Sequence, residues 1–380
     1  LMTLLVTPRI LPKMDFGDGI PDEFRTMVVV PSLLRDSAEI ENLLQQLELH
    51  YLCNSDPNIT FGLLTDFCDA PEEHMPQDAD LTAQIRRGID RLNKQHGESK
   101  DQGPFYLFHR KRLWNADEGF WMGWERKRGK LEEFNKLLLG EDSNPFITIA
   151  GDISILPQNR YVITLDADTS LPHGQAHRLI GTLAHPLNQA LIDTEKGRVT
   201  NGYTILQPRV EVKPISANHS RFSRIYSGYS GVDLYSVAVS DMYQDLMGEG
   251  IYMGKGIYDA ASFHHFLEER VPENTLLSHD LFEGLFCRAG FVSDVVAYEE
   301  YPPSYKAYAH RTHRWIRGDW QLLPWLLPNV PHKRNGRIRN GLRLIDRWKI
   351  SDNLRRSLLR PALMLLLIAG WLWLPGSSLV

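Results

Sequence analysis

Cysteine is scarce in this chain of 380 residues. The three cysteines are too few and too scattered for a disulfide scaffold or a four-ligand zinc site. Internal repeats and low-complexity stretches are absent from the sequence as well. Hydrophobic residues make up 43% and charged residues 23%, so the chain can bury a sizeable core and is neither disordered nor fibrous. Its length allows one large domain or two.

A net positive charge is lacking over most of the chain. The formal net charge is −5, but residues 331–380 carry a net +8, so residues 1–330 carry −13. A nucleic-acid-binding protein needs a basic surface that neutralises phosphates, and the acidic body therefore argues against nucleic acid as a partner. The basic stretch near the C-terminus needs another explanation.

A long uncharged run supplies that explanation. Residues 361–380 contain no charge, and twenty residues is about the length that spans a bilayer as a helix. The C-terminal position of this run excludes a signal peptide, and a buried core helix is the alternative. The Lys and Arg residues before it predict that the acidic body lies in the cytoplasm. Apolar side chains at near-helical spacing in residues 338–357 predict an amphipathic helix on the membrane surface, or an ordinary surface helix.

Short apolar runs alternate with longer helical stretches along the acidic body. This alternation predicts an α/β fold with a Rossmann-like, mostly parallel sheet. Ligands of such sheets bind beyond the carboxyl ends of the strands. Strands are expected at residues 27–31, 59–65, 104–109 and 161–166, and helices at residues 36–50, 80–95 and 130–139.

Carboxylates stand at two of these strand ends. Asp66 and Asp69 follow the second expected strand, and Asp166 and Asp168 follow the fourth. Two carboxylates at alternate positions offer hard oxygen ligands for Mg²⁺ or Mn²⁺, and the ion can also hold a diphosphate. A solvated turn is the alternative, but charged groups at a buried strand end cost free energy unless they serve a function.

Two glycine-containing segments bear on phosphate binding. In the basic segment that ends at Lys130, this lysine and its neighbours are expected to face the diphosphate, and Gly129 permits a close backbone approach. A solvated, charged helix start is the alternative. The glycine-rich segment 248–256 is not expected to be a phosphate loop, because Gly256 rather than Ser or Thr follows Lys255.

Two further segments carry candidate functional residues. Asp280 opens a helical pattern, where it can act as a general base for a hydroxyl nucleophile or serve as a helix cap. Residues 310–321 are dense in Arg and Trp, which suits recognition of sugars and phosphates, or else a basic interfacial helix beside the membrane.

Taken in order, these segments resemble the processive inverting nucleotide-sugar glycosyltransferases, the family of the cellulose, chitin and hyaluronan synthases. Two departures from the family's pattern are His279 in place of Glu and Arg311 in place of Gln. They make the chain more similar to one branch, the glycosyltransferase part of cyclic β-1,2-glucan synthases. The segments that carry the resemblance are Asp66, GKLEEFN (129–135), DAD (166–168), SHD (278–280) and RTHRW (311–315).

The resemblance implies a GT-A glycosyltransferase domain over residues 26–330. Residues 1–25 would lead in from an upstream membrane region. Residues 331–360 would form a basic amphipathic interfacial segment, and residues 361–380 a transmembrane helix that starts a further membrane region. The whole would be part of a larger protein of the bacterial inner membrane, with more spans, phosphorylase-like domains and its catalytic domain on the cytoplasmic side.

The resemblance also implies an activity, the transfer of glucose from UDP-glucose to a growing β-1,2-glucan acceptor with Mn²⁺ or Mg²⁺ as cofactor. Asp280 would be the catalytic base, and Trp315 would form an apolar floor for the acceptor sugar. The donor-binding residues would be Asp66, Asp69, Lys130, Asp166 and Asp168, the last two of which would also hold the metal. The acceptor-binding residues would be Arg314, Trp315, Arg317 and Trp320.

Other functions remain as alternatives at this point. A glycoside hydrolase or phosphorylase would need two acids flanking a bond and would not require the basic segment. Another processive β-glycan synthase of the cellulose type would share the motifs. A glycan-binding membrane module without activity would keep the aromatic residues but has no reason to retain Asp166, Asp168 and Asp280 together.

Overall fold

The computed structural model describes most of the chain, which divides into two compact units. Unit 1 comprises Leu1–Glu268 and Asp280–Tyr305, and unit 2 comprises Glu269–His279 and Lys306–Val380. The described residues are 7–97, 103–141, 144–193, 197–227 and 241–373.

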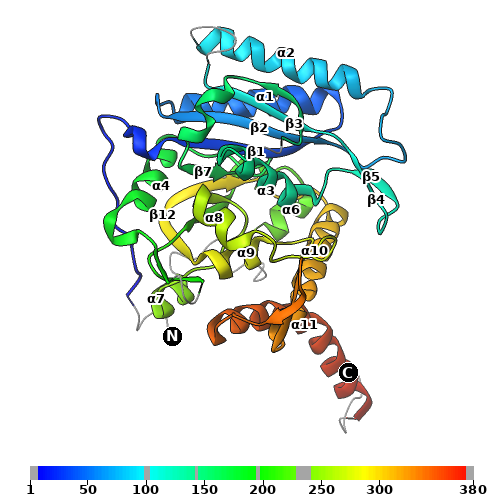
Figure 1. Ribbon diagram of the computed structural model, residues 1–380. Helices are drawn as coiled ribbons and strands as arrows, with labels where there is room; N and C mark the ends of the chain where they lie inside the picture. Colours follow the sequence, from blue (N-terminus) through cyan, green and yellow to red (C-terminus); the bar gives the residue numbers. More distant parts are fainter. Residues whose placement is uncertain (1–6, 98–102, 142–143, 194–196, 228–240, 374–380) are drawn as a thin grey trace. The chain divides into compact units, whose positions relative to one another are not determined.

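Unit 1 is built on a sheet whose eight strands, in the described part of the chain, have the order β12-β10-β11-β7-β1-β2-β3-β6 (Figure 1). Neighbouring strands pair in parallel except that β11 and β6 run opposite to their neighbours, so the prediction of a mostly parallel sheet in an α/β fold is confirmed. The strands are β1 Thr26–Leu34, β2 Ile59–Phe67, β3 Phe105–Arg110, β6 Phe146–Ala150, β7 Tyr161–Thr164, β10 Ile205–Val212, β11 Gly256–Asp259 and β12 Ala289–Glu299.

Helices and two small hairpins complete unit 1. The expected helices at residues 36–50, 80–95 and 130–139 are confirmed as α1, α2 and α3, and Asp36 caps the first of them by accepting from the Glu39 N–H. The helices are α1 Ser37–Cys53, α2 Asp78–His96, α3 Arg126–Leu138, α4 Gln175–Ala184, α5 Pro214–Ala217, α6 Arg221–Tyr226, α7 Met242–Met247, α8 Ala260–Leu267 and α9 Asp280–Cys287. The hairpins are β4 Leu113–Asn115 with β5 Phe120–Met122, and β8 Leu191–Asp193 with β9 Arg198–Asn201.

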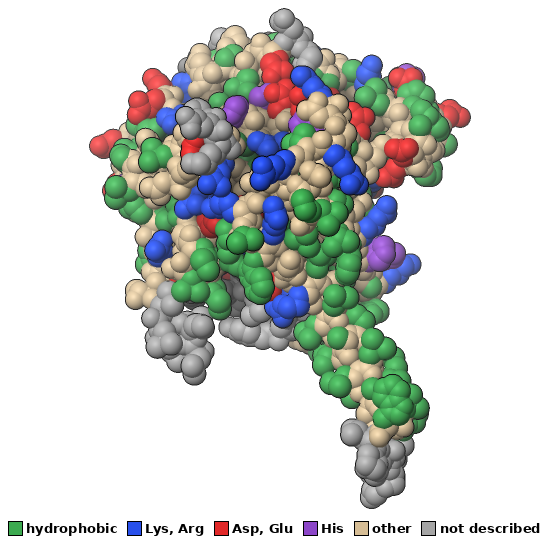
Figure 2. Space-filling model, turned by 60° about the horizontal axis from the view of Figure 1, so that its bottom comes forward, with side chains coloured by type: hydrophobic (Ala, Val, Ile, Leu, Met, Phe, Trp, Pro, Cys, Tyr) green, Lys and Arg blue, Asp and Glu red, His purple; other side chains and the backbone are tan. Residues whose placement is uncertain are grey.

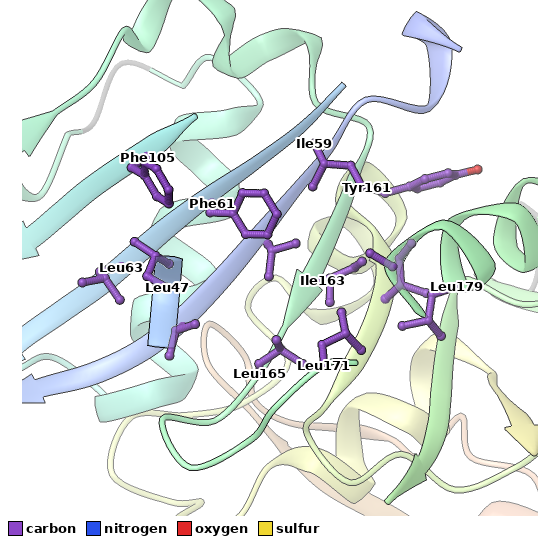
Figure 3. Close-up of a cluster of buried hydrophobic side chains, with 14 of the residues drawn as sticks. Leu47, Ile59, Phe61, Leu63, Phe105, Tyr161, Ile163, Leu165, Leu171 and Leu179 are labelled. Atoms are coloured by element: carbon purple, nitrogen blue, oxygen red, sulfur yellow. The ribbon is translucent and has the colours of Figure 1, made fainter. Parts of the chain in front are cut away.

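The central strands are buried on both faces. In β1, Val28 and Val30 join one hydrophobic cluster with α1, α2 and α4, while Met27 and Val29 join another with α3 and α8. This alternation follows from the two-residue period of a strand, and it explains why the central strands are continuous apolar runs. Figure 3 shows the first cluster, where Phe61, Phe105 and Ile163 lie among side chains from neighbouring strands and helices.

Unit 2 contains two longer helices and a hairpin. The prediction of a helix over residues 338–357 is wrong for its first part, because residues 336–339 form a strand of this hairpin. Residues 333–335 form the loop, and Gly336, which pairs with His332, has φ +64°, the left-handed conformation typical of three-residue hairpin loops. The elements are α10 Tyr305–Gln321, which starts at the last residue of unit 1, β13 Asn329–His332, β14 Gly336–Arg339 and α11 Leu344–Trp373.

Helix α11 is continuous through Pro361 and is long and apolar enough to cross a membrane. Its most apolar window has a mean hydropathy of 1.3, and none of that window is buried in the structure, unlike a core helix. Figure 2 shows hydrophobic side chains along the exposed part of this helix. The expected span of residues 361–380 therefore coincides with the C-terminal part of α11, and residues 374–380 lie outside the described residues.

Candidate functional site

A group of charged residues of unit 1 lies at the carboxyl edge of its sheet. Because β11 runs opposite to β7 and β10, the residue just before β11 lies at the same edge as the residues that end the parallel strands. This is the edge at which α/β sheets bind their ligands. The residues concerned are Asp66 in β2, Arg110 at the end of β3, Asp166 and Asp168 after β7, Lys255 before β11 and Glu299 at the end of β12.

Asp66 lies inside a closed network of charges. Arg110 donates from Nε to Asp66 Oδ1 and from Nη2 to Oδ2, both at 2.8 Å, and Lys130 Nζ lies 3.1 Å from Oδ2. The three side chains are only 2 to 3% exposed. Burial alone would raise the pKa of Asp66, but the charges of Lys130 and Arg110 outweigh it and hold the pKa below its usual value.

The same network fixes the start of α3. Arg110 Nη1 donates to Trp124 O and Nη2 to Arg126 O, each at 3.1 Å, and Arg110 also pairs with Glu133. Lys130 Nζ donates to Ser32 O at 2.6 Å. Burial lowers the pKa of Lys130 to about 8. The ammonium group of Lys130, which the sequence assigns to the diphosphate, is thus buried and bonded to Asp66 and Ser32 O.

Asp69 differs from Asp66 although it is only three residues away. Its carboxylate lies 3.1 Å from Arg126 Nη2, and both side chains are more than one-third exposed. Arg126 also pairs with Glu118 at 2.9 Å. Of the two aspartates expected to hold the nucleotide, Asp69 is the one that a ligand can reach directly.

Asp166 forms the second charged centre of this edge. Lys127 Nζ donates to Oδ1 at 2.6 Å, and Lys255 Nζ lies 3.1 Å from Oδ2, so each carboxylate oxygen faces an ammonium group. Lys255 also contacts Glu299 Oε2 at 2.8 Å. Burial would raise the pKa of Asp166, but the two lysines lower it well below its usual range. The side chain of Asp166 is nevertheless 35% exposed.

Asp168 lies in an environment of surplus negative charge. Burial, followed by the charge of Glu299, raises the pKa of Asp168 to about 6. The isolated bridge between Ser170 and Tyr298, with N···O distances of 2.7 and 2.8 Å, ties this loop to the end of β12 and so holds Glu299 nearby. Oxygen ligands that repel one another suit a hard divalent cation, so the residues present fit Mg²⁺ or Mn²⁺.

Asp280, the first residue of α9, belongs to the same centre. A Cβ atom built on Gly254 would collide with the Asp280 carboxylate, so the carboxylate lies directly against this backbone. Lys127 Nζ donates to Gly254 O at 3.0 Å, and the charge of Asp280 helps to raise the pKa of Lys127 against the effect of its burial. The structure therefore brings Asp280 together with Asp166, as the sequence motifs suggested.

The four expected acceptor-binding residues lie in unit 2, on α10. Arg314, Trp315, Arg317 and Trp320 are all exposed. Arg311 stacks over the Trp315 ring at 4.9 Å, and Trp320 Nε1 donates to Ser357 Oγ at 3.0 Å. Exposed indole faces suit sugar rings, and the acceptor role of these residues stays a prediction.

The structure adds residues that sequence patterns did not single out. Lys127 and Lys255 contact Asp166, Glu299 contacts Lys255, and Arg110 closes the network around Asp66. The available signals were the run of basic residues before Gly129 and the glycines that flank Lys255. Neither signal says which lysine meets which carboxylate, because that depends on pairing between distant strands.

Comparison with known proteins matches this chain over its whole length. The cyclic beta-(1,2)-glucan synthase NdvB of Rhizobium meliloti (strain 1021) is 41% identical over 383 residues, which covers 100% of the chain. The chain is similar to a segment of that glucan synthase. The segment amounts to 13% of the synthase's length, so the chain corresponds to one part of a much larger polypeptide. No protein-family model matches the chain.

The similarity to NdvB extends over both units, and the charged edge of unit 1 and the apolar helix of unit 2 lie within it. The resemblance to cyclic β-1,2-glucan synthases inferred from the motifs is thereby confirmed. The name of this relative describes NdvB as a whole, of which the chain matches one segment.

Proposed function

We propose that unit 1 is an inverting glucosyltransferase domain of the GT-A type, which moves glucose from UDP-glucose to the non-reducing end of a growing β-1,2-glucan. The observation that supports this most is the convergence of Asp166, Asp168 and Asp280 at the carboxyl edge of the sheet. The similarity to NdvB supports the choice of sugar and linkage.

Asp168 and Asp166 would hold Mn²⁺ or Mg²⁺ together with the donor diphosphate. When bound, such an ion neutralises charge on the departing diphosphate. Glu299 adds to the negative potential at Asp168, and the lysines keep Asp166 ionised. Asp69 is the accessible carboxylate that would bind the ribose or uracil. Asp66 is buried and pairs with Arg110 at the end of β3.

The chemistry requires one base and one displacement. Asp280 takes the proton of the acceptor hydroxyl as its oxygen attacks the anomeric carbon of glucose. The bond from that carbon to the diphosphate oxygen breaks, and its electron pair leaves with UDP. A single displacement on an α-linked donor yields a β-linked product.

The acceptor glucan and the membrane would be bound by unit 2. Arg314, Trp315, Arg317 and Trp320 would bind the acceptor glucan, because indole and guanidinium groups suit sugar faces and hydroxyls. Helix α11 would anchor the chain in a bacterial inner membrane with unit 1 on the cytoplasmic side. Other domains of the same polypeptide would complete the cyclic product.

The test is to supply the full-length membrane-embedded protein with radiolabelled UDP-glucose and to determine the linkage of the product by methylation analysis. We expect 1,2-linked glucan, loss of incorporation in EDTA, and recovery with Mn²⁺ or Mg²⁺. A 1,4-linked product would indicate a cellulose-type synthase instead. Full incorporation by Asp168→Ala in EDTA would overturn the assignment of this centre.

A further inference from the structure

Two ammonium groups converge on one carboxylate at the open end of the sheet. Lys127 Nζ and Lys255 Nζ contact the two different oxygens of Asp166, at 2.6 and 3.1 Å. They come from separate elements, Lys127 from the first turn of α3 and Lys255 from the residue before β11. Asp166 therefore holds two cations side by side at the edge where a ligand of this fold binds.

The backbone around Lys255 is shaped to deliver its side chain there. Gly254 and Gly256 flank it with φ values of +78° and +142°, which residues with a Cβ atom rarely adopt. A Cβ on Gly256 would collide with Leu206 O, and one on Gly254 would collide with the Asp280 carboxylate. The Gly254-Lys255-Gly256 sequence does not match a phosphate loop. Its two glycines instead permit the backbone conformation that brings Lys255 to the edge between β7 and β10.

Both lysines are charged and held in place. Lys255 is 8% exposed, and its contacts with Asp166 and Glu299 more than offset the cost of burying its charge. Lys127 is held by Asp166 and by Gly254 O. An ammonium group has three N–H donors, and in the described part of the chain each lysine has two such partners. Counting only these described partners, each ammonium group keeps one donor for a further acceptor.

Lys130 offers a contrast. Its Nζ is enclosed by Asp66 and Ser32 O and is 3% exposed. Asp166, which carries the other two lysines, is 35% exposed. Lys127 and Lys255 are themselves 26% and 8% exposed, so both side chains are more accessible to a phosphate than Lys130 is.

We propose that Lys127 and Lys255 are the diphosphate-binding pair of the donor site, with Asp166 and Glu299 as the residues that position them. This rests on the proposed use of a nucleotide diphosphate at this edge. When the bond to glucose breaks, the electron pair stays on the diphosphate oxygen, and the two ammonium groups donate to the oxygens that gain the charge. Charge-assisted hydrogen bonds of this kind stabilise the departing group.

The test is calorimetric titration of the full-length protein in detergent with UDP and, separately, with uridine, both in the presence of Mn²⁺. We expect Lys255→Gln and Lys127→Gln each to weaken UDP binding by about 10- to 100-fold, as estimated for hydrogen bonds to charged groups. Uridine affinity should stay unchanged, because uridine carries no phosphate. Lys255→Arg should retain UDP affinity within a few-fold, since it keeps the charge.

Lys136→Gln is the matched control. Lys136 also lies on α3, but its Nζ pairs with Glu132 at a distance of 3.6 Å and does not contact Asp166. It should leave both affinities unchanged. If wild-type protein binds UDP and Lys255→Gln and Lys127→Gln bind it as tightly, the inference is wrong while the proposed function survives. An equal loss of uridine and UDP affinity in these variants would also overturn it, by showing a structural role. If wild-type protein does not bind UDP, both proposals fail.

Discussion

Two aspartates on either side of β1 each meet two cationic side chains, but in different surroundings. Asp66 is paired with Arg110 and Lys130 in a network whose members are 2 to 3% exposed. Asp166 is paired with Lys127 and Lys255 and is 35% exposed. Ion pairs that solvent cannot reach (a sealed network) hold secondary-structure elements together. In ion pairs that solvent can reach (an open network), a side chain can replace its protein partner by a ligand. Charge pattern alone does not separate the two cases, but exposure does.

For the general base of the open centre, the comparison predicts that a substitution lowers activity and leaves stability unchanged. Asp280→Asn should lower glucose transfer by about 10²- to 10⁴-fold, because a general base acts in the transition state. UDP-glucose affinity and the unfolding temperature should stay near wild-type values. The measurement is turnover beside donor binding and thermal unfolding of the same preparation.

Asp259→Asn provides a matched control for this change. Asp259 caps α8 by accepting from the Ser262 N–H, and Asn caps a helix about as well as Asp. Asp259→Asn should therefore change neither the unfolding temperature nor the rate of glucose transfer appreciably. Near-normal turnover of Asp280→Asn would mean that Asp280 is a helix cap, and the base would then have to be sought elsewhere, first at Glu283.

A change in the sealed network should have the opposite effect. Arg110→Met removes one of the two cationic partners of buried Asp66, which keeps only Lys130, and also removes a partner of Glu133. We expect a loss of about 3 to 5 kcal/mol in the free energy of unfolding, as is typical for breaking a buried ion pair. Thermal and urea unfolding measure it. Unchanged stability together with lost UDP binding would place Arg110 in the donor site instead.

Asp168 should show a trade-off between stability and cation binding. Its pKa is raised from 3.8 to about 6, so the folded protein holds this proton more tightly than the unfolded chain does. Ionisation of Asp168 therefore lowers stability as pH rises through this range. In EDTA at pH 7, Asp168→Asn should stabilise the protein by about 1 to 3 kcal/mol while abolishing Mn²⁺ binding.

This prediction has its own control in Glu300, an exposed neighbour of Glu299 that pairs with Lys213 at 3.4 Å. Glu300→Gln should leave both Mn²⁺ binding, followed by paramagnetic resonance, and the unfolding temperature unchanged. Destabilisation of Asp168→Asn in EDTA at pH 7 would contradict the surplus negative charge inferred for this loop.

The smallest effect is expected at Arg126, which pairs with Asp69 and Glu118 at the surface. Exposed ion pairs contribute little, so Arg126→Gln should change the free energy of unfolding by less than about 1 kcal/mol. A loss as large as that of Arg110→Met would show that exposure does not distinguish the two kinds of network.

Local patterns in the sequence predict much of this fold because its central strands are buried on both faces. Continuous apolar runs such as residues 27–31 and 59–65 can be recognised without tertiary information, and the carboxylates that follow them lie at the expected edge. Asp166 and Asp168 could be selected for this reason, whereas Asp280 was selected as the start of a helical pattern. The hairpin at residues 329–339 was not predicted, because its second strand lies in the basic segment 331–360, where apolar spacing indicated a helix from residue 338.

The partners of these carboxylates could not be predicted in the same way. Lys255 reaches Asp166 because β11 runs antiparallel between β7 and β10, and nothing near residue 255 specifies that direction. Lys130 and Lys127 stand one turn apart on α3, and only the packing of that helix decides which of them is sealed. Side chains that depend on long-range pairing require the structure.

The most direct test of the central claim is a structure of the full-length protein with UDP and Mn²⁺ bound. The account predicts the diphosphate oxygens at about 3 Å from Nζ of Lys127 and Lys255, the hydrogen-bond distance, and the ion at Asp168. It also predicts that the contacts of Arg110 and Lys130 with Asp66 remain closed. A diphosphate bound to Lys130 with that network opened, or a nucleotide away from the carboxyl edge of the sheet, would contradict it.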